Sequence, residues 1–214
     1  MSTREKILAA ADALFGEVGF DAASTRDIAA LSGVNKPLVH YHFKNKEDLL
    51  RAVLDRYYEK LTLTLQAQIA RKGDARDQIV RLIGVYVDFL SANRNFSRIV
   101  QREASGGKNV AQIAERTYPI FQIGMRFISD AFPATRKGDL AASHLFISFY
   151  GMIVTYFTYN EVLEHLFKSD PLSEKNLRAR KRHLRRMAEL ILAEIEYSPQ
   201  HRTSAGRLTG RPEA

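Results

Sequence analysis

Apolar residues recur at the spacing of an α-helix along almost the whole chain. Near the N-terminus, for example, Ile7, Ala11, Leu14 and Val18 lie on one stripe of a helix, because a helix completes a turn in about 3.6 residues. No stretch alternates apolar and polar residues for long, as a half-buried β-strand does. The sequence therefore predicts an all-α protein with about nine helices.

Residues that end helices or favour turns divide this pattern into segments. Residues 1–46 contain three predicted helices, and residues 47–197 contain the longer ones. The later helices are expected over residues 46–72, 75–92, 96–104, 110–132, 139–167 and 173–197. Residues 198–214 are rich in Arg, Gly, Pro, Ser and Thr and offer little to bury, so we expect a disordered tail there.

The composition is that of a folded protein, because 45% of the residues are hydrophobic and 26% are charged. The chain has no Cys, which excludes disulfides and cysteine nucleophiles and agrees with a reducing compartment. The N-terminal residues lack the apolar segment of a signal peptide. The longest apolar run, Leu145 to Phe157, is shorter than the roughly 20 residues of a membrane span. We therefore expect a cytoplasmic protein with no membrane partner.

Residues 24–43 contain two short predicted helices that a tight turn joins. Ser24 and Asp27 have the spacing of a capping box at the start of the first helix. Gly33 lies in the turn, where it relieves crowding between the helices, and Asn35 can cap the second helix. This spacing predicts a helix-turn-helix. The expected core residues are Ile28, Leu31, Val34 and Val39, together with Leu8, Leu14 and Phe15.

The second of these helices is expected to lie in the major groove of DNA. Lys36 can donate a hydrogen bond to guanine, and Leu38 can contact a thymine methyl group. Tyr41, His42 and Lys46 are better placed to contact phosphates, which set the register of a protein on DNA. Thr25 can present the N-terminus of the preceding helix to a phosphate. The candidate DNA-binding residues are Thr25, Arg26, Lys36, Pro37, Leu38, His40, Tyr41, His42 and Lys46.

Several motifs of this region resemble the N-terminal signature of the tetracycline-repressor (TetR) family. They are Thr25-Arg26-Asp27-Ile28-Ala29, Ser32-Gly33-Val34, and the run from Tyr41 to Leu50. The resemblance covers residues 4–50 and implies a homodimer that binds a palindromic operator in double-stranded DNA. The sequence departs from the family at His40, where an aromatic residue is common, and at Leu38, where a small or hydroxyl residue is common.

Beyond this signature, residues from about 51 to 197 resemble the family only in their layout of long helices. The resemblance implies that residues 47–197 form a domain that binds a small-molecule effector and forms the dimer through residues 139–167 and 173–197. An interior rich in aromatic residues favours an apolar or aromatic effector, although aromatic residues at helical spacing are also typical of a plain core. The candidate effector-binding residues are Tyr86, Phe89, Arg98, Arg102, Phe121, Gln122, Met125, Tyr150 and Thr155.

Other functions remain open. The same layout also suits an activator or a dual regulator. A helical enzyme is a more distant alternative, since the sequence shows no catalytic residues at a recognisable spacing and no cofactor motif. His40 and His42 lack the further ligands of a metal site. The basic run over residues 178–186 is typical of the solvated face of an amphipathic helix.

A nonspecific DNA-packing protein is a further alternative, because the net charge of +8 favours polyanions. Such a protein needs basic residues on its DNA-binding part. Residues 1–46 are nearly balanced in charge, and the basic excess lies late in the chain. The distribution of charge therefore favours a focused DNA-binding face.

Overall fold

The computed structural model describes residues 1–105 and 108–197. These residues form ten α-helices and one 3-10 helix, and none of them forms a β-strand, which confirms the predicted all-α fold. The tail predicted over residues 198–214 lies outside the described residues. The elements are α1 (Thr3–Glu17), α2 (Thr25–Ser32), α3 (Lys36–His42), α4 (Lys46–Ile69), α5 (Ala75–Ala92), α6 (Arg94–Ala104), α7 (Val110–Ala131), η1 (Pro133–Arg136), α8 (Ala142–Thr158), α9 (Asn160–Phe167) and α10 (Glu174–Tyr197).

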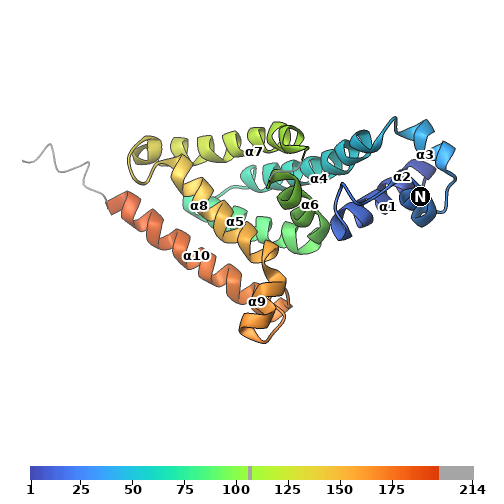
Figure 1. Ribbon diagram of the computed structural model, residues 1–214. Coiled ribbons are helices and arrows are strands. Elements are labelled where there is room, and N and C mark those ends of the chain that lie inside the picture. Colours follow the sequence, from blue (N-terminus) through green and yellow to red (C-terminus); the bar gives the residue numbers. More distant parts are fainter. Residues whose placement is uncertain (106–107, 198–214) are drawn as a thin grey trace, which may run out of the picture.

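The helices form an elongated molecule with α1, α2 and α3 at one end (Figure 1). We call these three helices the N-terminal unit. From this unit α4 runs into the larger part of the molecule, where it packs against α5 and α7. In that part, α10 packs along α5, while α8 lies against α5, α6 and α7. Because α1 packs against both α4 and α6, the N-terminal unit is joined to the rest of the protein through two helices.

The predicted caps form the turns of the N-terminal unit. The Asp27 N–H donates to the Ser24 hydroxyl (3.1 Å), and the Ser24 N–H donates to the Asp27 carboxylate (3.2 Å), which confirms the capping box. Gly33 has φ of 68°, a left-handed conformation that glycine adopts without a steric penalty. Asn35 accepts a hydrogen bond from the Leu38 N–H (3.0 Å). These local contacts fix where α2 ends and α3 begins.

The core of the N-terminal unit differs from the prediction at one residue. Phe15, Ile28 and Val39 are fully buried as expected, but Leu31 is 57% exposed. The side chains that α2 buries are Ile28 and Ala29. On an ideal helix, Leu31 lies about 110° around the axis from the midpoint of these two residues, so it faces away from the core.

The predicted helix over residues 139–167 is two helices in the structure. α8 ends at Thr158, and α9 begins at Asn160. Tyr159 between them has φ of −97° and ψ of 21°, which lies away from the usual helical ψ of about −42°. Neither Gly nor Pro stands at this break, so no local signal marks it in the sequence. This break accounts for the tenth α-helix.

Lys46 holds the loop between α1 and α2. Its ammonium donates hydrogen bonds to the carbonyl oxygens of Phe20 (2.7 Å), Asp21 (3.2 Å) and Ala23 (2.9 Å). The ammonium also lies 4.4 Å from the centre of the Phe20 ring. A lysine ammonium has three donors, so all of them are used within the protein. Lys46 therefore has a role within the fold, and its contact with a DNA phosphate stays a prediction.

Replacing Lys46 with Met keeps the length of the side chain and removes its charge. We expect the free energy of unfolding to fall by about 2 kcal/mol, because three carbonyl groups lose a charged donor. Urea denaturation followed by circular dichroism measures this change. Lys44→Met is the matched control, since Lys44 is exposed. An equal loss of stability in both variants would contradict the role given to Lys46.

Candidate nucleic-acid interface and ligand cavity

One face of α3 is exposed to solvent and the other anchors the helix. Val39 is buried in the core of the N-terminal unit, whereas Tyr41 is 82% exposed. An exposed aromatic residue of this size on a short helix is not explained by packing, because large apolar surfaces are normally buried. The other exposed side chains of α3 are Lys36, Pro37, Leu38 and His40.

The remaining candidate DNA-binding residues lie at the end of α3 and at the start of α2. His42 is half-buried, with its ring centre 5.2 Å from that of Tyr41 and 6.5 Å from that of Phe43. Thr25 is half-buried as the first residue of α2, and Arg26 is exposed. The structure thus places eight of the nine candidates on α2 or α3, and the ninth, Lys46, is used in the fold.

The larger part of the molecule contains a partly open cavity of about 170 Å³ between α4, α5, α6, α7 and α8. Aliphatic side chains such as Leu61, Ile83 and Ile153 and aromatic rings such as Phe121 and Phe146 form most of its wall. Its polar lining residues are Tyr58, Thr62, Gln66, Tyr86, Thr117 and Tyr150. A concave apolar cavity with a few polar groups is the usual form of a small-molecule site.

Three of the candidate effector-binding residues line this cavity, namely Tyr86, Phe121 and Tyr150. The prediction missed Tyr58, Thr62 and Gln66 on α4. These three recur every four residues along the helix, so they share one face. The sequence shows that these three residues share a face of the helix. It does not show that this face lines a cavity, because the cavity forms only when α5, α6, α7 and α8 pack against α4.

The other six candidates lie outside the lining of this cavity, and their contact with an effector stays a prediction. Phe89 packs against Phe96 in the core, with ring centres 5.5 Å apart. Thr155 is exposed, because it lies five residues and about 140° around α8 from the lining residue Tyr150. Met125 lies at a separate surface hollow.

The polar members of this group have partners elsewhere. Arg98 forms an exposed ion pair with Glu161 (3.6 Å). Gln122 donates a hydrogen bond to the Tyr118 hydroxyl (2.6 Å). Arg102 donates to the Glu17 carbonyl (3.1 Å) at the end of α1. Arg98 and Arg102 therefore connect α6 to α9 and to α1, whereas Gln122 bonds within α7.

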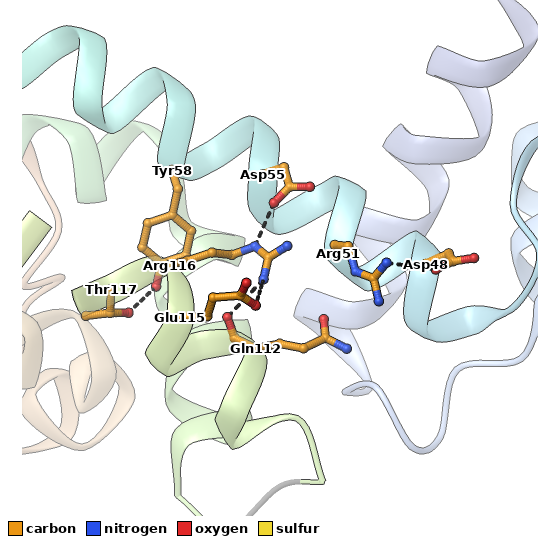
Figure 2. Close-up of polar contacts among 8 residues, drawn as sticks. All are labelled: Asp48, Arg51, Asp55, Tyr58, Gln112, Glu115, Arg116 and Thr117. Atoms are coloured by element: carbon orange, nitrogen blue, oxygen red, sulfur yellow. Dashed lines mark hydrogen bonds and ion pairs between the residues drawn. The ribbon is translucent and has the colours of Figure 1, made fainter. Parts of the chain in front are cut away.

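Tyr58 connects α4 to α7 within the wall of the cavity. Its hydroxyl shares a hydrogen bond with the Thr117 hydroxyl (2.7 Å), as Figure 2 shows. Burial raises the pKa of Tyr58 to about 12, because a buried phenolate loses hydration. The phenol is therefore neutral at physiological pH.

A second link between α4 and α7 lies beside the first. The Arg116 Nε donates to the Asp55 carboxylate (2.6 Å), and its Nη1 donates to the Gln112 carbonyl (3.0 Å) (Figure 2). The Arg116 side chain is only 13% exposed. The Asp55 side chain is 56% exposed, so solvent screens this ion pair from one side and its contribution is that of a partly exposed pair.

The N-terminal unit makes a close contact with α6. A Cβ atom added at Gly16 on α1 would lie 2.6 Å from the Asn95 side chain, which is shorter than van der Waals contact. Beside it, the Arg102 guanidinium donates to the carbonyl of Glu17 at the C-terminal end of α1, where the helix dipole favours a positive charge. This contact joins the N-terminal unit to a helix that lines the cavity through Phe96 and Val100.

Among residues 1–105 and 108–197, no three His, Asp or Glu side chains lie together as a metal site requires. None of the helices described there is both long and apolar enough to cross a membrane.

Comparison with known proteins agrees with this geometry. Residues 7–53 match the family model of bacterial regulatory proteins, tetR family. YttP of Bacillus subtilis, named a probable HTH-type transcriptional regulator, is 28% identical over 120 residues, which are 55% of this chain and 58% of the relative. The HTH-type transcriptional repressor Rv3405c of Mycobacterium tuberculosis is 52% identical over 62 residues, which are 29% of this chain and 33% of the relative. The matches thus span between a third and just over half of these relatives.

Solved structures share the whole fold. AibR in complex with isovaleryl coenzyme A and operator DNA superposes with a TM-score of 0.70 at 16% identity, over 87% of this chain and 97% of AibR. This likeness concerns the fold alone. Residues 7–53 thus match the tetR family of bacterial regulatory proteins, and the all-α architecture of the described residues agrees with that match.

Proposed function

We propose that the protein is a transcriptional regulator that binds an operator as a homodimer and is released from DNA by a small molecule. The observation that carries this proposal is the exposed face of α3, which presents Lys36, Leu38, His40 and Tyr41 on a helix anchored by the buried Val39. A short helix held in this way fits the major groove of B-DNA. The cytoplasm is the proposed location, since the operator is there.

The relatives support the choice of DNA as the partner. YttP and Rv3405c are named as transcriptional regulators, and the AibR structure contains operator DNA. Repression is the direction we propose, because release by a ligand needs only a loss of DNA affinity. Activation by the same arrangement is the alternative. A reporter gene behind the operator distinguishes them, since deletion of a repressor raises expression and deletion of an activator lowers it.

The first test is a gel-shift titration against the DNA upstream of the protein's own gene, with random DNA as competitor. A discrete complex with one palindrome that resists the competitor is the expected result. Specific complexes are typically at least a thousandfold tighter than nonspecific ones. Equal affinity for random DNA would contradict a sequence-specific regulator and favour the nonspecific alternative.

Lys36→Ala tests the proposed DNA-binding face. We expect this variant to bind the operator about tenfold to a hundredfold more weakly, because a lysine contact to a guanine edge contributes about 1–3 kcal/mol to discrimination. The same titration measures the loss. Lys72→Ala removes an equal charge from an exposed position between α4 and α5 and should bind as the wild type does. Equal weakening of both variants would assign the effect to net charge.

We propose that the homodimer forms through α8 and α10. Along α8, the side chains of Ile147, Ser148 and Thr155 are exposed on one side of the helix. A Cβ atom added at Gly151 would meet nothing within 4 Å in the protomer. This face is therefore open, and its small residues allow a partner helix to approach closely, as an isologous interface requires.

Gly151→Arg is expected to abolish the dimer and leave the protomer folded. The new side chain has open space in the protomer, but in the proposed interface it would bury an unpaired charge. Sedimentation velocity measures the mass, and circular dichroism checks the fold. Gly84→Arg on α5 is the matched control, because a Cβ atom there also meets nothing within 4 Å. A dimeric Gly151→Arg variant would show that the interface lies elsewhere.

We propose that α4 transmits ligand binding to the N-terminal unit. One end of α4 follows α3 after Phe43, Lys44 and Asn45, and its other end lines the cavity through Tyr58, Thr62 and Gln66. The two recognition helices of a dimer must lie about 34 Å apart to enter successive major grooves. A ligand that binds better when they are further apart lowers DNA affinity by its differential affinity for the two states.

Arg116→Met tests this proposal by removing the ion pair between α7 and α4. We expect the distance between the two N-terminal units of the dimer to become more variable. The chain has no Cys, so Ala22→Cys in the exposed loop after α1 gives one spin-label site per protomer, and double electron–electron resonance measures the distances. Arg51→Met is the control, because Arg51 pairs with Asp48 within α4 (3.3 Å) (Figure 2). Identical distance distributions in both variants would contradict the role of Arg116.

A further inference from the structure

Two tyrosines in the cavity wall have hydroxyl groups without a partner. The rings of Tyr86 on α5 and Tyr150 on α8 are stacked, with centres 6.3 Å apart and planes 21° apart. Both residues line the cavity. Within residues 1–105 and 108–197, neither hydroxyl makes a hydrogen bond, whereas the nearby Tyr58 hydroxyl bonds to Thr117.

An unpartnered hydroxyl in an apolar site is available to a ligand. Tyr86 is half-buried, and burial raises its pKa well above the ordinary value, so its phenol stays protonated and can both donate and accept a hydrogen bond. Burial raises the pKa of Tyr150 in the same way. Neither hydroxyl is among the fully buried side-chain atoms that lack a partner, so both are accessible from the cavity, where a ligand can bond to them. Phenylalanine would fill the same space without offering a hydrogen bond.

The lining also limits the charge of a ligand. No Lys, Arg, His, Asp or Glu is among the described residues that line the cavity. An ionised group placed there would lose its hydration without a counter-charge. The volume of about 170 Å³ is similar to that of an apolar cavity of about 150 Å³ that holds benzene in another protein. Both properties favour a small and uncharged molecule.

We propose that Tyr86 and Tyr150 together bind one neutral hydroxyl or carbonyl group of a small, otherwise apolar ligand. The pair determines specificity, because it favours such a ligand over a hydrocarbon of the same shape and over an anion. This inference rests on the proposed role of the cavity as the ligand site, and it adds the chemical class of the ligand.

Three probes that share a methylphenyl group distinguish a neutral polar ligand from a hydrocarbon and from an anion. They are para-cresol, toluene and para-toluate. An apolar cavity without available polar groups prefers toluene, because the cresol hydroxyl loses hydration on entry. The full-length protein is expected to bind cresol about tenfold more tightly than toluene, since the tyrosines replace the lost hydrogen bonds. Toluate should bind at least about a hundredfold more weakly than cresol, because its charge is unpaired. Isothermal titration calorimetry measures all three affinities.

Variants connect the preference to the two hydroxyls. The double variant Tyr86→Phe, Tyr150→Phe keeps both rings and should bind toluene at least as tightly as the wild type, while the preference for cresol disappears. Tyr118→Phe is the matched control, because Tyr118 is an exposed tyrosine on α7 outside the cavity lining. It should retain the preference for cresol.

Three results would overturn the proposal. They are binding of toluene at or above the affinity of cresol, tighter binding of toluate, and binding of none of the probes. A cresol preference that persists in the double variant would assign the recognition to other residues. The gel-shift titration on the same preparations is independent of these results. Sequence-specific DNA binding without a preference for cresol would support the regulator proposal and contradict this ligand class. A preference for cresol without sequence-specific DNA binding would support the ligand site and contradict the regulator proposal.

Discussion

The structure depends on the burial of the first half of α4. Leu49, Leu50, Val53 and Leu54 are completely buried in the core that α4 shares with α1. Fully buried aliphatic side chains of this size each contribute about 1.5–3 kcal/mol from the hydrophobic effect. A core packed to this degree does not deform continuously. The N-terminal unit and the start of α4 therefore move as one body, and any change in the direction of α4 carries the exposed face of α3 with it.

The second half of α4 belongs to a different environment. Tyr57 still faces the N-terminal unit, where its hydroxyl donates to Asp12 (2.7 Å), whereas the next residue, Tyr58, faces the cavity. Burial is the main cause of the raised pKa of Tyr57, so this hydrogen bond lies in a poorly hydrated region. Two adjacent residues of one helix thus contact the two functional parts of the protein. The boundary between those parts lies within α4, and the chain crosses it without a flexible linker.

The sequence predicted correctly the features that depend on residues close together in the chain, and it failed for features that depend on distant residues. The caps at Ser24 and Asn35 and the turn at Gly33 depend on neighbours within a few residues, and all three were predicted. Lys46 bonds to carbonyl groups more than 20 residues away in the sequence. The periodicity of apolar residues does not predict such hydrogen bonds. The cavity depends on the packing of five helices, so only three of nine candidate residues line it. The break at Tyr159 has no local signal at all.

The two links between α4 and α7 suggest how much a ligand can change. The Tyr58–Thr117 hydrogen bond lies in the cavity wall, and a neutral hydrogen bond contributes about 1 kcal/mol, which is less than a tenfold change in an equilibrium. A ligand that only exchanged this bond for its own would therefore shift DNA affinity only slightly. A larger shift needs a change in apolar packing, at about 25 cal/mol for each Å² of apolar surface that is buried in one state and exposed in the other. On this reasoning, the polar groups of the cavity determine which ligand binds, and the change in apolar packing around the bound ligand shifts α4.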